Sequence, residues 1–246
     1  MKTIWIPREV LTWDMEVDSS TVFDDNESLR SYEIWEHSKN LISSHTSEFQ
    51  LVDSIANLKR SLNQRLQLIE KRYNLKSINY RNKPKGYLEL LEQYNVVRPF
   101  LMRILLSIRN EIEHNDMRPP DLNRCQELLD VTWYFLRSTD HIIRNQIDKL
   151  VISMPREQDK KGNYWINLDI DFGVPVSLKV NCWLPDEFVS QTKKNDFLRV
   201  DAVEFRQFDN KNIYRDRLSA DVNVRGKMIL DADDLFTLVK KTLSMY

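Results

Sequence analysis

Glycine and cysteine are scarce in this sequence, with four and two copies among 246 residues. So few glycines disfavour the glycine-rich loops with which many enzymes cradle phosphates, and they favour long helices. Cys125 and Cys182 stand alone, without the spacing of a metal site, which fits a reducing compartment. We therefore expect neither a cofactor nor a bound metal.

Long hydrophobic runs are also missing. No apolar stretch approaches the ~20 residues that a membrane-spanning helix needs. The first ten residues, MKTIWIPREV, lack the apolar region of a signal peptide. Hydrophobic residues make up 41% of the chain and charged residues 30%, as in a soluble protein that can bury a core. The composition therefore predicts a cytoplasmic protein with no membrane partner, and the length favours two modest domains.

Charge is nearly balanced overall, at −1, but it is unevenly distributed. Residues 1–53 carry 4 basic and 11 acidic side chains, whereas residues 59–109 carry 12 basic and 3 acidic ones. A basic segment of that size is typical of a surface that binds a polyanion. The alternative is that the acidic N-terminal segment folds over the basic helices and neutralises them. The sequence leaves both interpretations open.

The hydrophobic pattern changes period along the chain. Between residues 27 and 150, apolar residues recur every three or four positions, most clearly over 48–73, and this spacing predicts helices. Near residue 155 the period changes, and from Ile166 to Cys182 apolar residues alternate strictly, which predicts strands with one buried face. Asp121 and Asp231 are expected to cap helices.

We therefore predict an α+β protein in three parts. Residues 1–26 form an N-terminal arm, residues 27–150 an all-α helical bundle, and residues 151–246 a smaller antiparallel β-rich domain with a C-terminal helix. The last helix of the bundle is expected to run from Asp121 to about Leu150, with a break near residues 138–140. Strands over 198–208 and 218–230 are expected to flank a turn at 209–212.

One predicted helix carries a group of residues with possible chemistry. The stretch 101–114, LMRILLSIRNEIEH, has one apolar face, and Arg109, Asn110 and His114 lie off it. Asn110 and His114 are four residues apart and therefore neighbours on a helix surface. Arg109 and His114 would lie about 140° apart around a straight helix. A shared site then requires a frayed last turn or a second copy of the helix.

This arrangement resembles the motif of the HEPN superfamily (higher eukaryotes and prokaryotes nucleotide-binding), an all-helical domain found in RNA-cleaving toxins and defence proteins. The family pattern is Arg, a polar residue such as Asn, and His five to seven positions after the Arg; here it reads Arg109-Asn110-x3-His114. Arg30 and His37 also fit the spacing, but Ser31 stands where the Asn should be. The resemblance covers roughly residues 27–150 and makes that domain HEPN-like.

The resemblance implies a metal-independent endoribonuclease, a toxin or phage-defence effector that cleaves RNA through attack of the 2′-hydroxyl. His114 would be the general acid or base, Arg109 would stabilise charge on phosphorus, and Asn110 would orient His114 or the phosphate. The implied partners are RNA, a second copy in a homodimer, and an antitoxin or regulatory protein. Family toxins neutralised by a nucleotidyltransferase carry a tyrosine two residues after the His, where this chain has Asp116, which disfavours that type of antitoxin.

Candidate nucleic-acid contacts lie outside the motif. They are Arg81, Lys83 and Lys85, in a basic loop over 74–86, and Arg103 in the motif helix. Tyr80 in the same loop could stack on a base. The alternative is that the loop is only solvated.

Two rival interpretations remain. Asp169 and Asp171 share one strand face, as the metal-binding carboxylates of nucleotidyltransferases do, but alternating acids are typical of a solvent-facing strand. The alternative to an enzyme is a non-catalytic HEPN-like module that binds RNA or protein, with the β domain as the reader.

Overall fold

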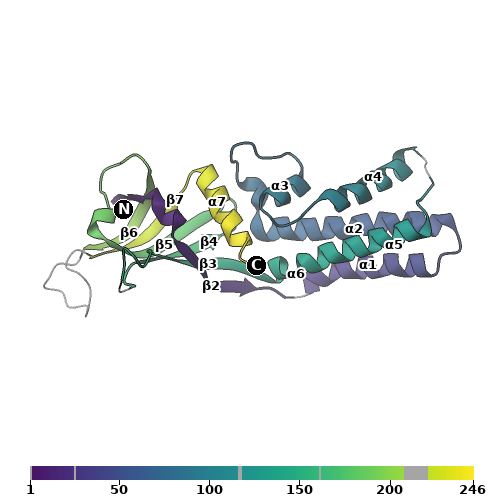
Figure 1. The fold of residues 1–246 in the computed structure, drawn as a ribbon, viewed down its shortest axis with the longest axis horizontal. Helices are drawn as coiled ribbons and strands as arrows, with labels where there is room; N and C mark the ends of the chain where they lie inside the picture. The colour runs from purple at the N-terminus through teal and green to yellow at the C-terminus, as the bar shows by residue number, and fades with distance from the viewer. Residues whose placement is uncertain (1, 25, 116–117, 161, 208–220) are drawn as a thin grey trace.

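A computed structural model describes residues 2–24, 26–115, 118–160, 162–207 and 221–246, apart from the side chains of 101 and 113–115. Figure 1 shows an elongated molecule with a β-sheet at one end and a bundle of long helices at the other. The C-terminal helix lies over the sheet, beside the bundle. The expected turn at 209–212 lies outside the described residues.

The described strands form one seven-stranded antiparallel sheet in the order β1-β6-β7-β5-β4-β3-β2. Their bounds are β1 Lys2–Pro7, β2 Asp14–Val22, β3 Asn145–Ser153, β4 Trp165–Asp171, β5 Ser177–Pro185, β6 Phe197–Gln207 and β7 Asp221–Ile229. Short 3-10 turns follow β1 (Arg8–Thr12) and β5 (Asp186–Phe188). The expected break between β4 and β5 at Gly173 and Pro175 is confirmed.

The predicted fold class, an all-α bundle followed by a smaller β domain, is wrong. β1 and β2 precede every helix, and they form the two edges of the sheet. The bundle is therefore inserted between β2 and β3. Sequence reasoning missed this arrangement because β1 pairs with β6, almost 200 residues away, and because most of β2 is exposed and lacks an alternating apolar pattern.

Among the described residues, six α-helices lie between β2 and β3, and one follows the sheet. They are α1 Asn26–Ser43, α2 Glu48–Tyr73, α3 Tyr87–Gln93, α4 Phe100–Asn115, α5 Leu122–Ser138, α6 Asp140–Arg144 and α7 Ala232–Leu243. The predicted caps are confirmed, because Asp121 accepts a hydrogen bond from the Arg124 backbone N–H and Asp231 from that of Asp234, each at 2.8 Å. None of the helices among the described residues is long and apolar enough to cross a membrane.

The last helix of the bundle ends earlier than predicted. α6 stops at Arg144, and β3 begins at Asn145 rather than after residue 150. Ile147, Leu150 and Ile152 are buried there within a strand. The first two also fit helical spacing, and for that reason the sequence pattern extended the helix too far.

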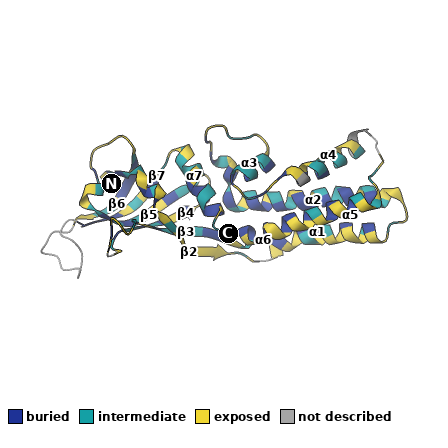
Figure 2. Ribbon diagram, in the orientation of Figure 1, coloured by how far each residue is buried: buried dark blue, intermediate teal, exposed yellow. Residues whose placement is uncertain are grey.

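The sheet has one apolar and one polar face. Alternate residues of the central strands, such as Leu168, Val180 and Val224, are buried on the side that α7 covers with Leu238 and Val239. Figure 2 shows the buried residues running from this face into the bundle. The opposite face, called here the outer face, carries mainly polar and charged side chains.

A buried ion pair ties the bundle together. Arg65 of α2 has no exposed side-chain surface, and its Nη1 donates to Asp140 Oδ1 of α6 at 2.9 Å and to the Leu136 carbonyl at 3.1 Å. The Tyr32 hydroxyl of α1 donates to the other Asp140 oxygen at 2.8 Å. Three helices and the start of a fourth therefore share one charged network.

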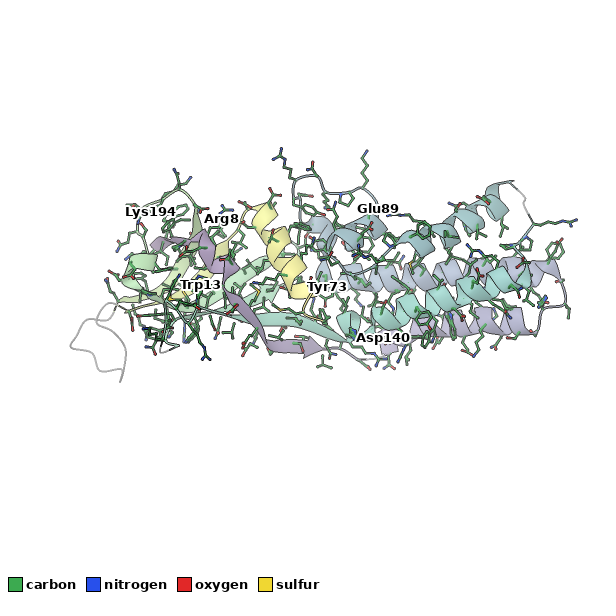
Figure 3. All side chains as sticks on the ribbon, in the orientation of Figure 1. Arg8, Trp13, Tyr73, Glu89, Asp140 and Lys194 are labelled. Carbon is green, nitrogen blue, oxygen red and sulfur yellow. The ribbon has the colours of Figure 1, made fainter. Side chains whose placement is uncertain are left out.

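A second set of contacts joins the bundle to the sheet. The Tyr73 hydroxyl, at the end of α2, donates to the Ile142 carbonyl at 2.8 Å and lies 2.5 Å from the Tyr246 hydroxyl. The Tyr246 oxygen also accepts from the Ile147 backbone N–H in β3 at 2.8 Å. Figure 3 shows Tyr73 and Asp140 close to the place where the helices meet the sheet.

Replacing Asp140 with alanine should destabilise the protein by about 3–5 kcal/mol, because the guanidinium of Arg65 would stay charged and buried without its partner. Urea unfolding followed by circular dichroism measures this loss. Glu33→Ala is the matched control, since Glu33 pairs with Arg30 on the exposed surface of α1 at 2.7 Å and its removal should change little. Equal midpoints for both variants would contradict a stabilising role of the buried pair.

Both cysteines should resist alkylation in the folded protein. Burial raises the pKa of Cys125 to about 11 and that of Cys182 to about 12, so that neither thiol ionises appreciably at pH 8. A thiol reagent at pH 8 should leave the native protein unmodified and label both residues in denaturant, as read by mass spectrometry. Fast labelling of either residue under native conditions would contradict its burial.

Candidate functional site

The candidate motif lies on α4, which packs along α2 and α5. Met102 and Leu105 are buried, and Ile104, Ile108 and Ile112 are partly buried against the same core. This apolar face fixes the rotation of the helix. The side chains of Arg109 and Asn110 lie off that face, where they can contact a ligand.

Arg109 and Asn110 are in direct contact. Arg109 is half-buried, and its Nη1 donates to the Asn110 Oδ1 at 3.2 Å, while Asn110 is exposed. The contact holds the guanidinium next to an amide that can still donate through its nitrogen. The pair is therefore arranged to bind an anionic oxygen such as that of a phosphate.

Lys59 of α2 adds a second positive charge near Arg109. Its pKa is lowered, first by burial and then by the charge of Arg109. The positive charges of Lys59 and Arg109 repel each other, which raises the free energy of their charged forms. An anion near both side chains would therefore stabilise them. Sequence reasoning missed Lys59 because a lysine within a long amphipathic helix gives no signal of its own; only its position beside Leu58, at the border of the apolar stripe, could have indicated it.

His114 is placed only in part. Its backbone belongs to the last turn of α4, but its side chain lies outside the described residues, as do those of Glu113 and Asn115. Asp116 lies outside them entirely. The angular separation of Arg109 and His114 therefore stays a prediction from helix geometry.

The second Arg/His pair has a different setting. Arg30 and His37 lie on the exposed surface of α1, where Arg30 pairs with Glu33 at 2.7 Å. An exposed pair of this kind makes a useful internal control for the motif.

The basic loop is held against α7 by its backbone. The Arg81 backbone N–H donates to Asp233 Oδ1 at 2.8 Å, which leaves the guanidinium exposed. Lys83 Nζ donates to Asn79 Oδ1 at 3.2 Å and to the Lys76 carbonyl. Lys85 is exposed. The loop therefore presents positive charge to solvent from a fixed backbone.

The other two nucleic-acid candidates of this region are engaged within the protein. Arg103 forms ion pairs with Glu89 at 3.2 Å and Glu92 at 3.1 Å, so an RNA phosphate would have to compete with two carboxylates. The interpretation of Tyr80 as a stacking platform is wrong. Its ring is 7% exposed and stacks on Phe236 of α7, with centroids 3.9 Å apart.

The acidic segment 1–53 neutralises the basic segment only in part. Residues 2–22 form sheet edges and the turn between them and do not cover the helices, but Glu27 of α1 pairs with Lys71 at 2.5 Å and Arg72 at 2.9 Å. Much of the remaining positive charge of the segment is still exposed, as at Arg81 and Lys85.

The carboxylates of β4 lie on the outer face. Asp169 and Asp171 are both exposed, and Asp171 accepts a hydrogen bond from the Gly173 backbone N–H at 3.0 Å. No group of three or more His, Cys, Asp or Glu side chains suited to a metal ion occurs in the part of the chain that the structure describes.

Replacing Arg81, Lys83 and Lys85 together with alanine should weaken RNA binding equally across sequences. Each lost phosphate contact removes ~0.7 from the slope of log K against log salt for a single strand, so three lost contacts lower it by about 2. A salt titration with labelled RNA measures the slope. The double variant Lys193→Ala/Lys194→Ala, in an exposed loop before β6, is the control, and an unchanged slope in the loop variant would exclude the loop from the interface.

Known proteins give no information about the role of these residues. No family model, no curated protein and no solved structure matches this chain. The site is therefore defined by Arg109, Asn110 and Lys59, with His114 one turn further along α4.

Proposed function

We propose that this protein is a metal-independent endoribonuclease of the HEPN type, acting as a toxin or phage-defence effector. The observation that carries the proposal is the hydrogen bond from Arg109 Nη1 to the exposed amide of Asn110 at 3.2 Å, with Lys59 of α2 near enough to interact electrostatically with Arg109. The motif Arg109-Asn110-x3-His114 adds a histidine, the side chain whose ordinary pKa best suits proton transfer near neutral pH.

The proposed reaction needs no metal. His114 removes the proton of a ribose 2′-hydroxyl, and the resulting oxygen attacks the adjacent phosphorus. The bond from phosphorus to the 5′-oxygen breaks, and that oxygen takes up a proton. The products are a 2′,3′-cyclic phosphate and a 5′-hydroxyl end. Arg109 and Lys59 stabilise the additional negative charge on the phosphoryl oxygens during attack.

We further propose that two copies of the chain complete the site. Helix geometry predicts that Arg109 and His114 lie about 140° apart on one helix, so one residue of each copy has to face the other across a two-fold axis. Phe100 on α4 and Tyr134 on α5 are 68% and 67% exposed, and such large apolar side chains suit a contact between copies. RNA is the proposed substrate, and an antitoxin or regulatory protein is the proposed partner in the cell.

Arg109→Ala and His114→Ala should each abolish RNA cleavage while the protein stays folded, because helical periodicity predicts both positions off the apolar face of α4. Gel assays with single-stranded RNA in the presence of EDTA, together with thermal unfolding, measure both effects. Lys59→Ala should lower the rate without abolishing it. The products should carry 2′,3′-cyclic phosphates.

The matched controls are Arg30→Ala and His37→Ala, the second pair with the same kind of spacing, which should retain full activity. Inhibition by EDTA or products with 3′-hydroxyl ends would overturn the proposal. Equal loss of thermal stability in Arg109→Ala and His114→Ala would assign these residues a structural role instead.

A mixing experiment tests the composite site. Arg109→Ala and His114→Ala protomers, each inactive alone, should regain about a quarter of the wild-type activity when unfolded and refolded together, since half of the dimers are mixed and each mixed dimer restores one of two sites. Light scattering should show a dimer. A mixture that stays inactive although mixed dimers form would place the complete site within one chain.

A further inference from the structure

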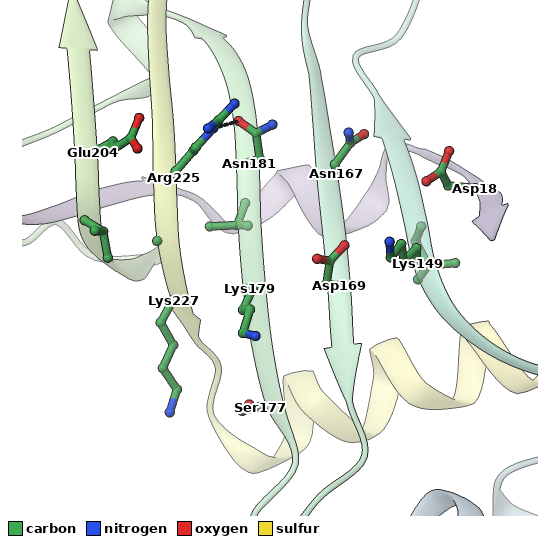
Figure 4. Close-up of a pocket in the computed structure, with 14 residues that line it drawn as sticks. Asp18, Lys149, Asn167, Asp169, Ser177, Lys179, Asn181, Glu204, Arg225 and Lys227 are labelled. Carbon is green, nitrogen blue, oxygen red and sulfur yellow. Dashed lines mark hydrogen bonds between the residues drawn. The ribbon is translucent and has the colours of Figure 1, made fainter. Parts of the chain in front are cut away.

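A hollow of about 670 Å³, lined mostly by polar and charged residues, lies on the outer face of the sheet (Figure 4). Its floor is made by the central strands β3, β4, β5 and β7, and it is bounded by β6 and by Asp18 of β2. A β-bulge in β6 between Ala202 and Glu204 bends that strand, which increases the curvature of the sheet. Hollows of this volume are large enough for a small organic ligand.

The register of the strands arranges the side chains of the hollow in two rows. One row runs Asn167, Asn181, Arg225 and Glu204 across β4, β5, β7 and β6. The neighbouring row runs Lys149, Asp169, Lys179 and Lys227 across β3, β4, β5 and β7. An amide row and a lysine row therefore lie side by side on one surface.

The lysine row carries three positive charges, with the carboxylates of Asp169 and Asp201 as cross-strand neighbours. Lys179 and Lys227 are direct cross-strand neighbours, an arrangement that costs stability for like charges. Among the described residues, no carboxylate lies within ion-pair distance of the ammonium groups of Lys149, Lys179 or Lys227. Asp169 offsets part of this charge from the next strand. Asp201, opposite Lys227 in β6, offsets a further part, although it is also engaged by Arg199 at 2.8 Å. An anion at Lys179 and Lys227 would remove the repulsion between them.

The amide row offers directional hydrogen bonds. Asn181 Oδ1 accepts from Arg225 Nε at 3.3 Å and from Asn223 Nδ2 at 3.3 Å, which fixes the orientation of this amide. Glu204 pairs with Arg206 at 3.2 Å and is therefore already engaged outside the hollow. Asn167 is half-buried beside Asn181, and a free amide both donates and accepts. This combination suits the polar edge of a nucleobase.

Aromatic side chains continue the same face. Trp165 and Trp183 are cross-strand partners one row beyond Asn167 and Asn181, and both are partly exposed. Indole rings on a sheet provide stacking surfaces for bases, and the energy of stacking depends little on sequence. Phosphate-binding, base-pairing and stacking groups therefore follow one another across three adjacent rows.

We propose that the outer face binds a nucleotide, with its phosphate at Lys179 and Lys227 and its base against Asn167 and the Trp165/Trp183 pair. The same chemistry is offered by a free nucleotide and by one unit of a single-stranded RNA. This site lies on the sheet, away from α4, and it does not depend on the proposed cleavage at Arg109.

Isothermal titration of the full chain with adenosine 5′-monophosphate tests the free nucleotide. Fluorescence anisotropy with a labelled single-stranded RNA of about 12 nucleotides tests the strand, in the Arg109→Ala background so that the RNA stays intact. Binding of either probe that weakens in the Lys179→Gln/Lys227→Gln variant supports the site, and the probe that binds identifies its source. Binding of neither overturns the proposal, whether or not the unmodified chain cleaves RNA.

The double variant Lys179→Gln/Lys227→Gln should bind the preferred probe at least roughly tenfold more weakly, because two charge-assisted contacts to the phosphate are lost. Lys179→Arg/Lys227→Arg should retain binding and shows that the fold tolerates substitution there. Lys193→Gln/Lys194→Gln removes the same charge elsewhere and is the matched control. Equal affinities of the Lys179/Lys227 and Lys193/Lys194 glutamine variants would overturn the assignment.

Addition of the mononucleotide should also shift the indole N–H resonances of Trp165 and Trp183 in NMR spectra, assigned by Trp165→Phe and Trp183→Phe. The Lys179→Gln/Lys227→Gln variant should abolish these shifts. Shifts that persist in that variant would place the nucleotide elsewhere and overturn the proposal.

Discussion

The architecture of the helical bundle depends on one buried charge, that of Arg65. A guanidinium cannot lose its proton at any ordinary pH, so a position with no solvent exposure has to provide a carboxylate and several hydrogen-bond acceptors. Asp140, the Leu136 carbonyl and Ser31 do so from three different helices. The helices around α2 can therefore adopt few alternative registers, because each shift would leave this charge without partners.

The same network positions the sheet relative to the bundle. Asp140 opens α6, a helix of five residues, and β3 begins directly after it. The hydroxyls of Tyr73 and Tyr246 meet at the backbone of α6 and β3, and Asn74 Nδ2 donates to the Gly173 carbonyl at 2.7 Å. The candidate site on α4 and the outer face of the sheet are thus held in place by one continuous set of contacts.

Local patterns predicted the elements far better than their assembly. Helical spacing identified α2, and side chains suited to capping identified the starts of α5 and α7, since both signals depend only on neighbouring residues. The place of β1 and β2 could not be predicted, because an edge strand is defined by a partner distant in sequence. The same limit applies to the sites: Arg109 and Asn110 lie in one motif, whereas Lys59 and the rows of the outer face are brought together only by tertiary packing.

The pairing of Val22 with Asn145 has a further consequence. The chain leaves the sheet and returns to it at neighbouring positions of β2 and β3, so the whole bundle is an excursion from a single hairpin. Insertions of this kind can be exchanged, lengthened or lost while strand order and register persist, because the two ends stay a few ångströms apart. The bundle is thus an insertion into the sheet, and the sequences of the two parts can change independently during evolution.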